Sequence, residues 1–139
     1  MKSPTLVLAT LIFTLSALTS FAAEIKKMSA QTAAQLVAEG KAVLVDVREP
    51  AEVKESGTAG PAVLLPKSDF DGDQKLWKPF LAANAGKEII LFCRVGGRAG
   101  EVCSALGAKG VKAANLGGLK DWTNAGLPTR TADAPATKK

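Results

Sequence analysis

The stretch IILFCRVGGRAGEVCSAL, residues 89–106, predicts a strand, a tight turn and a helix in succession. Its first five residues are an uninterrupted apolar run that ends on Cys93, which is typical of a strand buried on both faces. Two glycines and two arginines follow. From Ala99 onward the apolar residues return at helical spacing, with Val102, Cys103 and Leu106 on the same face. The stretch therefore predicts a thiol and fixed positive charge where a buried strand gives way to a helix.

Predicted helices and strands alternate along the chain on both sides of this stretch. Before the stretch, we expect a helix over residues 29–40, a strand over 42–47, a short helix over 50–57 and a short apolar strand over 62–66. A helix from about residue 72 to 86 follows, which Pro79 breaks or kinks. After the stretch, we expect a strand over 111–116 and a short helix within 117–126. This alternation predicts an α/β fold: a single domain with a mainly parallel sheet of four to five strands and helices on both faces.

The first 22 residues are predicted to be a secretory signal peptide. An apolar stretch follows Lys2, and Ser20 and Ala22 supply the small residues that cleavage before Ala23 requires. The alternative is a retained membrane anchor, but the apolar core over residues 5–19 is shorter than the roughly 20 residues that span a bilayer. We expect export to a bacterial periplasm, a short N-terminal extension over residues 23–28, a domain over 29–128 and a polar, disordered tail over 129–139.

Composition excludes several classes of function. The 117 residues after the signal peptide carry 17 basic and 13 acidic side chains, a net charge of +4, without the arginine stripe typical of nucleic-acid binding. We therefore expect no nucleic-acid partner, and no membrane association once the signal peptide is removed. The chain contains no histidine, which excludes Ser-His-Asp and Cys-His catalysis.

Aspartates 69, 71 and 73 stand two apart, a spacing that hints at calcium. The glycine and glutamate that an EF-hand loop needs at its sixth and twelfth positions are here Gln74 and Phe80. We interpret the run as helix capping by Asp71 and first-turn charge from Asp73, and expect no metal site.

The loop after Cys93 has the composition of an anion-binding site. A strand-to-helix loop points backbone N–H groups at its centre, and the helix N-terminus adds partial positive charge there. Gly96 and Gly97 let the loop curl, while Arg94 and Arg98 add fixed charge. This setting favours a thiolate at Cys93 and hence a nucleophile. A buried cysteine before an ordinary turn is the structural alternative. Cys103, by contrast, is predicted to be a core residue, not a disulfide partner.

Three segments together resemble the rhodanese domains, a family of sulfurtransferases. CRVGGRA resembles their active loop, in which four residues separate the cysteine from an arginine. VLVDVREPAEV resembles their first strand with its Asp-x-Arg-Glu signature, and NLGGLKDWTNAGLP resembles their C-terminal Gly-Gly-x-x-x-Trp stretch. The resemblance runs from about Ser29 to Pro128 and suggests a small, exported, single-domain rhodanese. It departs from the family pattern where Thr58 replaces a histidine and where Gly60 and Pro61 exchange places.

The resemblance implies a two-step transfer through a persulfide on Cys93, with no cofactor. A small anionic donor such as thiosulfate would supply the sulfur, and a thiol, cyanide or a protein would accept it. The loop residues implied to bind the donor are Arg94, Val95, Gly96, Gly97 and Arg98, while Asp46 and Arg48 are assigned to a buried pair that organises the rim. For Arg98, substrate binding and bracing of the loop both remain open.

Two rival functions remain beside this one. The domain could be a persulfide carrier that relays sulfur to a protein without efficient turnover of small molecules. It could also be a phosphatase or arsenate reductase, enzymes that use a similar cysteine loop on the same fold. Their loop has five residues between cysteine and arginine, whereas Cys93 and Arg98 are separated by four, so the spacing favours sulfur.

Overall fold

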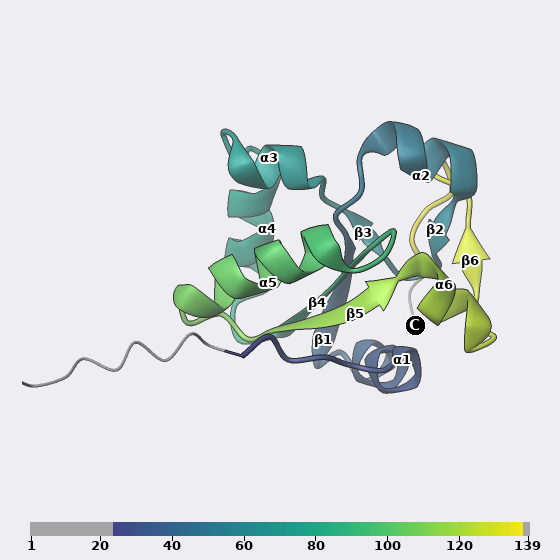
Figure 1. The fold of residues 1–139 in the computed structure, drawn as a ribbon, viewed down its shortest axis with the longest axis horizontal. Helices are drawn as coiled ribbons and strands as arrows, with labels where there is room; N and C mark the ends of the chain where they lie inside the picture. Colours follow the sequence, from purple (N-terminus) through teal and green to yellow (C-terminus); the bar gives the residue numbers. More distant parts are fainter. Residues whose placement is uncertain (1–23, 138–139) are drawn as a thin grey trace, which may run out of the picture.

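Four parallel strands form the centre of the protein, in the order β3-β1-β4-β5 (Figure 1). The computed structural model describes residues 24–137, so the predicted signal peptide lies outside the described residues. The strands are β1 (Ala42–Asp46), β3 (Val63–Leu64), β4 (Glu88–Cys93) and β5 (Ala113–Gly118). The predicted α/β fold with a mainly parallel sheet is confirmed.

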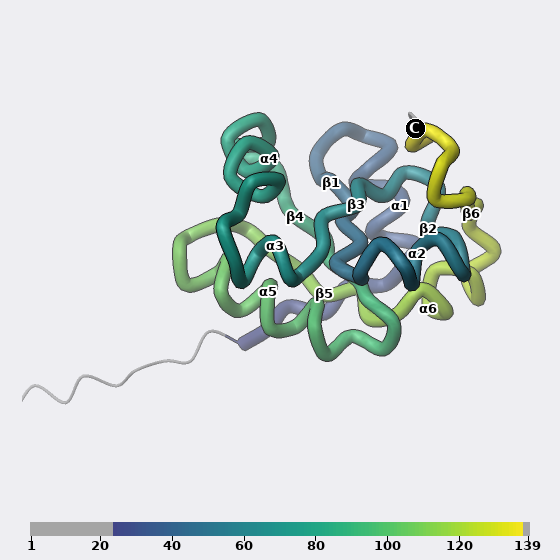
Figure 2. Tube along the Cα trace, turned by 90° about the horizontal axis from the view of Figure 1, so that it is seen from above, coloured from purple at the N-terminus to yellow at the C-terminus, as the bar shows by residue number. Residues whose placement is uncertain are grey.

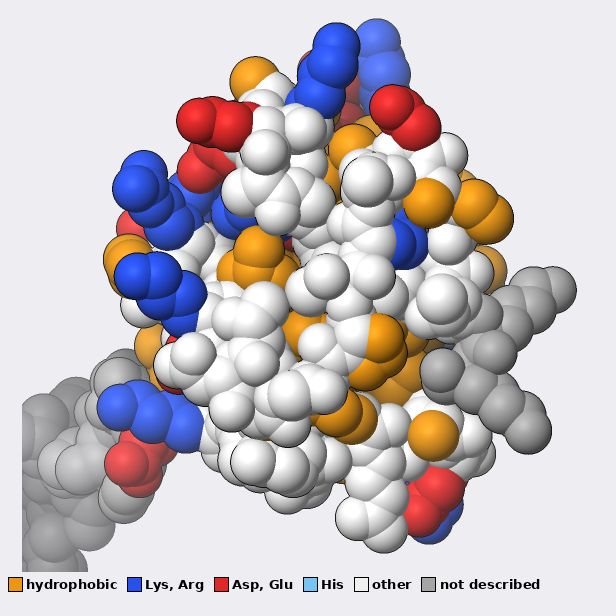
Figure 3. Space-filling model, turned by 90° about the vertical axis from the view of Figure 1, so that its right-hand side faces the viewer, with side chains coloured by type: hydrophobic (Ala, Val, Ile, Leu, Met, Phe, Trp, Pro, Cys, Tyr) orange, Lys and Arg blue, Asp and Glu red, His pale blue; other side chains and the backbone are white. Residues whose placement is uncertain are grey.

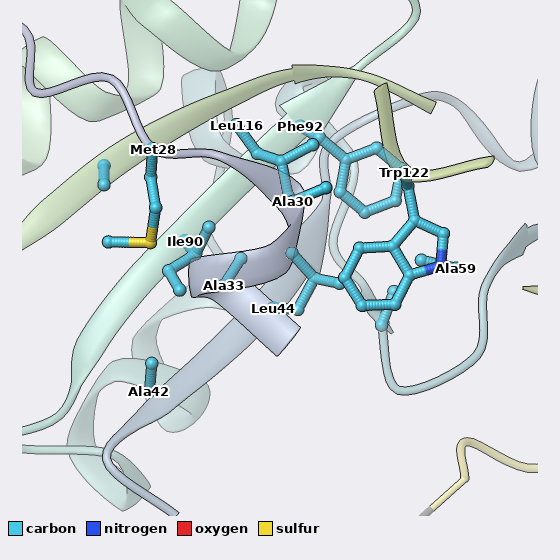
Figure 4. Close-up of a cluster of buried hydrophobic side chains, with 12 residues drawn as sticks. Met28, Ala30, Ala33, Ala42, Leu44, Ala59, Ile90, Phe92, Leu116 and Trp122 are labelled. Atoms are coloured by element: carbon cyan, nitrogen blue, oxygen red, sulfur yellow. The ribbon is translucent and has the colours of Figure 1, made fainter. Parts of the chain in front are cut away.

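Helices cover both faces of this sheet, and the alternation of side chains along each strand explains the two cores. On one face, Leu44 of β1 and Phe92 of β4 pack with Trp122 beneath α1 (Ala30–Ala38) and α6 (Leu119–Asn124), as Figure 4 shows. On the other face, Val45 and Leu91 pack against α3 (Lys67–Asp71), α4 (Trp77–Ala83) and α5 (Gly97–Ala108). Because both faces are buried, the strands are apolar almost throughout.

The two helices that frame β1 begin as their sequences predict. Ser29 caps α1 by accepting a hydrogen bond from the Thr32 N–H at 3.2 Å. Pro50 occupies the first position of α2 (Pro50–Ser56), where its missing N–H costs no hydrogen bond. At the start of α2, the N–H of Glu49 donates to the Glu52 carboxylate at 3.0 Å.

The predicted helix over residues 72–86 is wrong at its start. Helix α3 ends at Asp71 and a turn separates it from α4, which begins at Trp77. The carboxylate of Asp69 accepts hydrogen bonds from three consecutive backbone N–H groups, those of residues 75–77. Asp69 therefore serves the capping role that was assigned to Asp71. Pro79 lies in the first turn of α4, where no intrahelical N–H bond is required, so it does not break the helix.

The C-terminal tail is not disordered over residues 129–137, contrary to the expectation from its polar composition. Strand β6 (Thr129–Arg130) pairs antiparallel with β2 (Thr58–Ala59), and both Figure 1 and Figure 2 show the two strands side by side. The guanidinium of Arg130 donates to the carbonyls of Gly60 and Ala62, and the N–H of Thr137 also donates to Gly60. Partners about 70 residues away in sequence thus order the tail.

The segment before α1 packs along the outer edge of β5. The N–H of Met28 donates to the Asn115 carbonyl at 3.0 Å, and the N–H of Asn115 donates to the Lys26 carbonyl at 2.8 Å. Met28 itself is buried in the core. The expected N-terminal extension therefore includes part of the folded domain. Within residues 24–137, no helix has the length and apolar character needed to cross a membrane.

Candidate functional site

Cys93 ends β4 at the carboxyl edge of the sheet, as predicted. The strand pairs there with Gly118 of β5, and α5 begins four residues later at Gly97. Only 1% of the Cys93 surface is exposed, so the loop closes over the thiol. The N–H of Gly96 donates to Cys93 Sγ at 3.0 Å. Gly96 adopts φ of 99°, a conformation that glycine adopts without strain, and this turns its N–H inward.

Asn115 fixes the position of Gly96, and the sequence analysis did not identify it. Its Nδ2 donates to the Gly96 carbonyl at 3.0 Å, while its Oδ1 accepts from the Gly117 N–H at 2.9 Å. The register between β4 and β5 shifts here, so that Leu91 faces Asn115 but the next residue faces Gly117. This bulge turns Asn115 toward the loop, as bulges near active sites often do. The amide that contacts the sulfur is thus held from behind by a neighbouring strand.

Arg98 braces the loop through a bidentate pair with a carboxylate of α2. Its two terminal nitrogens donate to the two carboxylate oxygens of Glu52 at 2.6 and 2.8 Å. This bidentate pair lowers the pKa of Glu52 to about 2. It also raises the pKa of Arg98, with smaller contributions from Cys93. Of the two roles left open for Arg98, the geometry shows the bracing contact, and substrate binding stays a prediction. No local pattern identifies Glu52 as its partner, because the two residues are 46 positions apart.

Asp46 and Arg48 form the expected buried pair at the end of β1. The guanidinium of Arg48 donates to the Asp46 carboxylate at 2.7 Å and also to Ser56 Oγ and the Gly57 carbonyl. Thr58 completes this network by donating to Asp46 Oδ2 at 2.7 Å. Within residues 24–137 every buried side-chain nitrogen and oxygen has a hydrogen-bond partner. The residue that departs from the family pattern at position 58 therefore keeps a polar contact to this pair.

The remaining loop residues face outward. Arg94, Val95 and Gly97 are exposed, and 84% of the Val95 surface is accessible. Gly118 packs directly against the loop from β5, because a Cβ at this position would clash with the Arg94 carbonyl oxygen. The structure thus brings all six predicted loop residues together. Cys93 and Gly96 face inward, Arg98 pairs with Glu52, and the exposed residues are Arg94, Val95 and Gly97.

Cys103 lies where the helical spacing of α5 predicts it. The thiol is buried in the same core cluster as Cys93, and both cysteines are free. Burial raises the pKa of the Cys103 thiol, with a smaller effect from Glu88. Residues 24–137 contain no cluster of acidic, cysteine or histidine side chains that could hold a metal ion.

Comparison with known proteins adds a family and a set of related folds. The model of the rhodanese-like domain family matches residues 29–125. The uncharacterized protein slr1261 of Synechocystis is 38% identical over 109 residues, which are 76% of this chain and 56% of that protein. The chain thus spans little more than half the length of this curated relative.

Two solved structures illustrate the shared fold. A protein of unknown function from Rhodopseudomonas palustris, a possible tyrosine phosphatase, is 22% identical with a TM-score of 0.62, covering 76% of this chain and 85% of that one. A human single-domain sulfurtransferase is 24% identical with a TM-score of 0.51, covering 70% of this chain and 95% of that one. At such identities the likeness concerns the fold alone.

Proposed function

Because the chain belongs to the rhodanese-like domain family, we propose that it transfers a sulfane sulfur through a persulfide on Cys93. The observation that carries this proposal is the Gly96 N–H placed 3.0 Å from Cys93 Sγ at the end of a parallel strand. A hydrogen bond from a fixed backbone amide stabilises negative charge on Cys93 Sγ, both in the attacking thiolate and when that charge returns to Sγ as the persulfide S–S bond breaks.

The transfer has two steps in which atoms and charge balance. The Cys93 thiolate attacks the outer sulfur of thiosulfate, a new S–S bond forms, and the old S–S bond breaks with its electron pair leaving on sulfite. An acceptor anion such as cyanide or a thiolate then attacks the terminal sulfur of the Cys93 persulfide. The S–S bond breaks, the acceptor leaves carrying the sulfur, and the Cys93 thiolate is restored.

The closure of the loop supports a sulfane donor over a phosphate ester. Cys93 is almost fully covered, and a terminal sulfur atom is a slimmer group than a phosphate with its three non-bridging oxygens.

The direct test is incubation of the protein from Ala23 onward with thiosulfate, followed by intact mass measurement and a thiocyanate assay after cyanide is added. We expect a gain of one sulfur atom on Cys93 and its loss as thiocyanate. If the persulfide adduct forms but is not turned over, the result favours the persulfide-carrier function over the enzyme. A protein that gains no sulfur from thiosulfate or from an organic persulfide would overturn the proposal. Cys93→Ser is the matched control, because a hydroxyl cannot form a persulfide.

We also propose that the protein is exported to the periplasm after removal of residues 1–22. The support comes from the sequence alone: the short apolar core and the small residues Ser20 and Ala22. N-terminal sequencing of the protein from the exported fraction should give Ala23 as the first residue. Recovery of a form that keeps Met1 in the membrane fraction would contradict the proposal.

A further inference from the structure

Four cationic side chains lie around the site, and two of them are already committed. Arg48 is buried and bound to Asp46, and Arg98 is bound to Glu52. Within residues 24–137, neither Arg94 nor Lys120 forms an ion pair with a carboxylate. These two cations are therefore the ones left to meet an anionic donor.

Arg94 and Lys120 line the same surface depression beside the active loop. Arg94 and Val95 of the loop lie between two helices, with Glu55 on the α2 side and Leu119 and Lys120 on the α6 side. Gly118 holds the loop backbone against the start of α6, which brings Arg94 close to the segment that carries Lys120. Figure 3 shows this end of the molecule, where Lys and Arg side chains gather along one edge and acidic side chains stand near them.

The charges in this depression are asymmetric. Arg48 and Glu52 also line it, but each is held in an ion pair, with Asp46 and Arg98 respectively. Of the remaining charges, Arg94 and Lys120 attract an anion, whereas Glu55 is exposed and makes no ion pair among the described residues. Its carboxylate repels an anion that approaches from the α2 side. A donor with one anionic group next to its sulfur would bind with that group toward α6.

We propose that Lys120, together with Arg94, forms the anion-binding part of the donor site, and that Glu55 sets the opposite, anion-rejecting wall. This inference rests on the proposed sulfur transfer through Cys93. The preferred donors are those whose leaving group carries a negative charge, which the sulfonate of thiosulfate and the carboxylate of an organic persulfide share. Lys120 acts here as a positioning residue, since it holds the leaving group without touching the sulfur that is transferred.

Steady-state kinetics with three variants test this. Lys120→Gln should lower kcat/KM for thiosulfate by about 1.5-fold to 5-fold, the range expected for loss of one exposed charge contact. The effect should appear in KM, with kcat at saturation retained, and Lys120→Arg should restore it. Glu55→Gln should change KM in the opposite direction. Lys112→Gln is the matched control. Lys112 is exposed and lies beside the amino end of β5, at the opposite end of that strand from the active loop.

Donors of different charge show whether the site binds a sulfonate, a carboxylate or both. The persulfides of 3-mercaptopropionate and of cysteamine have similar size and end groups of opposite charge, a carboxylate and an ammonium. Lys120→Gln should weaken transfer from the carboxylate-bearing persulfide and from thiosulfate, but not from the ammonium-bearing one. If thiosulfate alone responds, the site is specific for the sulfonate. The salt dependence of kcat/KM for thiosulfate should also flatten in Lys120→Gln and not in Lys112→Gln.

The outcomes separate this inference from the proposed function. If wild-type protein forms the Cys93 persulfide but Lys120→Gln and Lys112→Gln have equal KM values for every donor, the anion-binding role of Lys120 is wrong and sulfur transfer stands. If kcat falls with KM unchanged, Lys120 has only a structural role and the inference is also wrong. If wild-type protein takes sulfur from none of the three donors, the proposed function itself fails.

Discussion

Replacing Asn115 with alanine should impair sulfur transfer more than it impairs folding. The side chain makes two hydrogen bonds, one to the Gly96 carbonyl at 3.0 Å and one from the Gly117 N–H at 2.9 Å. Each is worth about 1 kcal/mol net, so Asn115→Ala should lower the free energy of unfolding by about 2 kcal/mol. Gly96 also loses the anchor that aims its N–H at Cys93. Since removing one such donor outright costs roughly 100-fold or more, a misplaced donor should lower kcat/KM by about tenfold or more.

Two companion variants separate the loop effect from the loss of stability. Asn84→Ala removes one side-chain hydrogen bond, to the Phe80 carbonyl at 2.8 Å, far from the site at the end of α4. It should lower stability by about 1 kcal/mol and leave transfer unchanged. Asn115→Asp keeps the acceptor for Gly117 but faces the Gly96 carbonyl with an oxygen. Urea unfolding and the thiocyanate assay measure both quantities. If Asn115→Ala loses stability but transfers sulfur at the wild-type rate, the chain of contacts from Asn115 through Gly96 to Cys93 does not position the amide.

Three further predictions concern the brace, the packing of the loop and the two thiols. The pKa of Glu52 is lowered from 4.5 to about 2 by Arg98, so its stabilising effect is present above the unfolded-state pKa and is lost as pH falls toward 2. The difference in urea stability between wild type and Glu52→Gln should therefore shrink between about pH 5 and pH 2, and a constant difference would contradict the pairing. Gly118→Ala places a Cβ against the backbone carbonyl of the residue after Cys93 and should destabilise the protein by roughly 1–3 kcal/mol and reduce transfer. Gly107→Ala, on the open side of α5, should do neither, and equal behaviour of the two variants would refute the packing argument. Iodoacetamide should alkylate Cys93 at least about tenfold faster than Cys103, as measured by peptide mass spectrometry, and equal rates would remove the reason for choosing Cys93 as nucleophile.

The elements that the sequence predicts correctly are those that its local pattern determines. The apolar run before Cys93 and the helical spacing from Ala99 to Leu106 each contain their own periodicity, and both became the expected strand and helix. Ser29 caps α1 through a partner only three residues away. In each case the interacting groups lie within one or two turns of one another, so the residue types suffice.

The contacts that the sequence could not predict join residues far apart along the chain. Glu52 meets Arg98 across 46 positions, and Arg130 meets the Gly60 carbonyl across 70. The polar composition of the tail predicts disorder, because the sequence does not show which backbone carbonyls accept hydrogen bonds from the Arg130 guanidinium. Asn115 is missed for a different reason: it sits in a strand whose bulge redirects its side chain, and a local pattern of apolar residues does not show that bulge.

The absence of histidine from the chain is consistent with the chemistry that the site supports. Hydrolysis of a phosphate ester releases an alkoxide that needs a proton, so a phosphatase requires an acid beside its cysteine. Asp46 and Glu52 both accept from guanidinium groups, and the remaining carboxylate among the residues lining the depression beside the loop is the exposed Glu55. Sulfur transfer needs no such acid, because sulfite and thiolates leave as stable anions. What it needs is a thiolate, an amide to hold the charge and cations to guide the donor. In the proposed transfer, Cys93, Gly96 and the pair of Arg94 with Lys120 would fill these roles, in one loop and the helix start beside it.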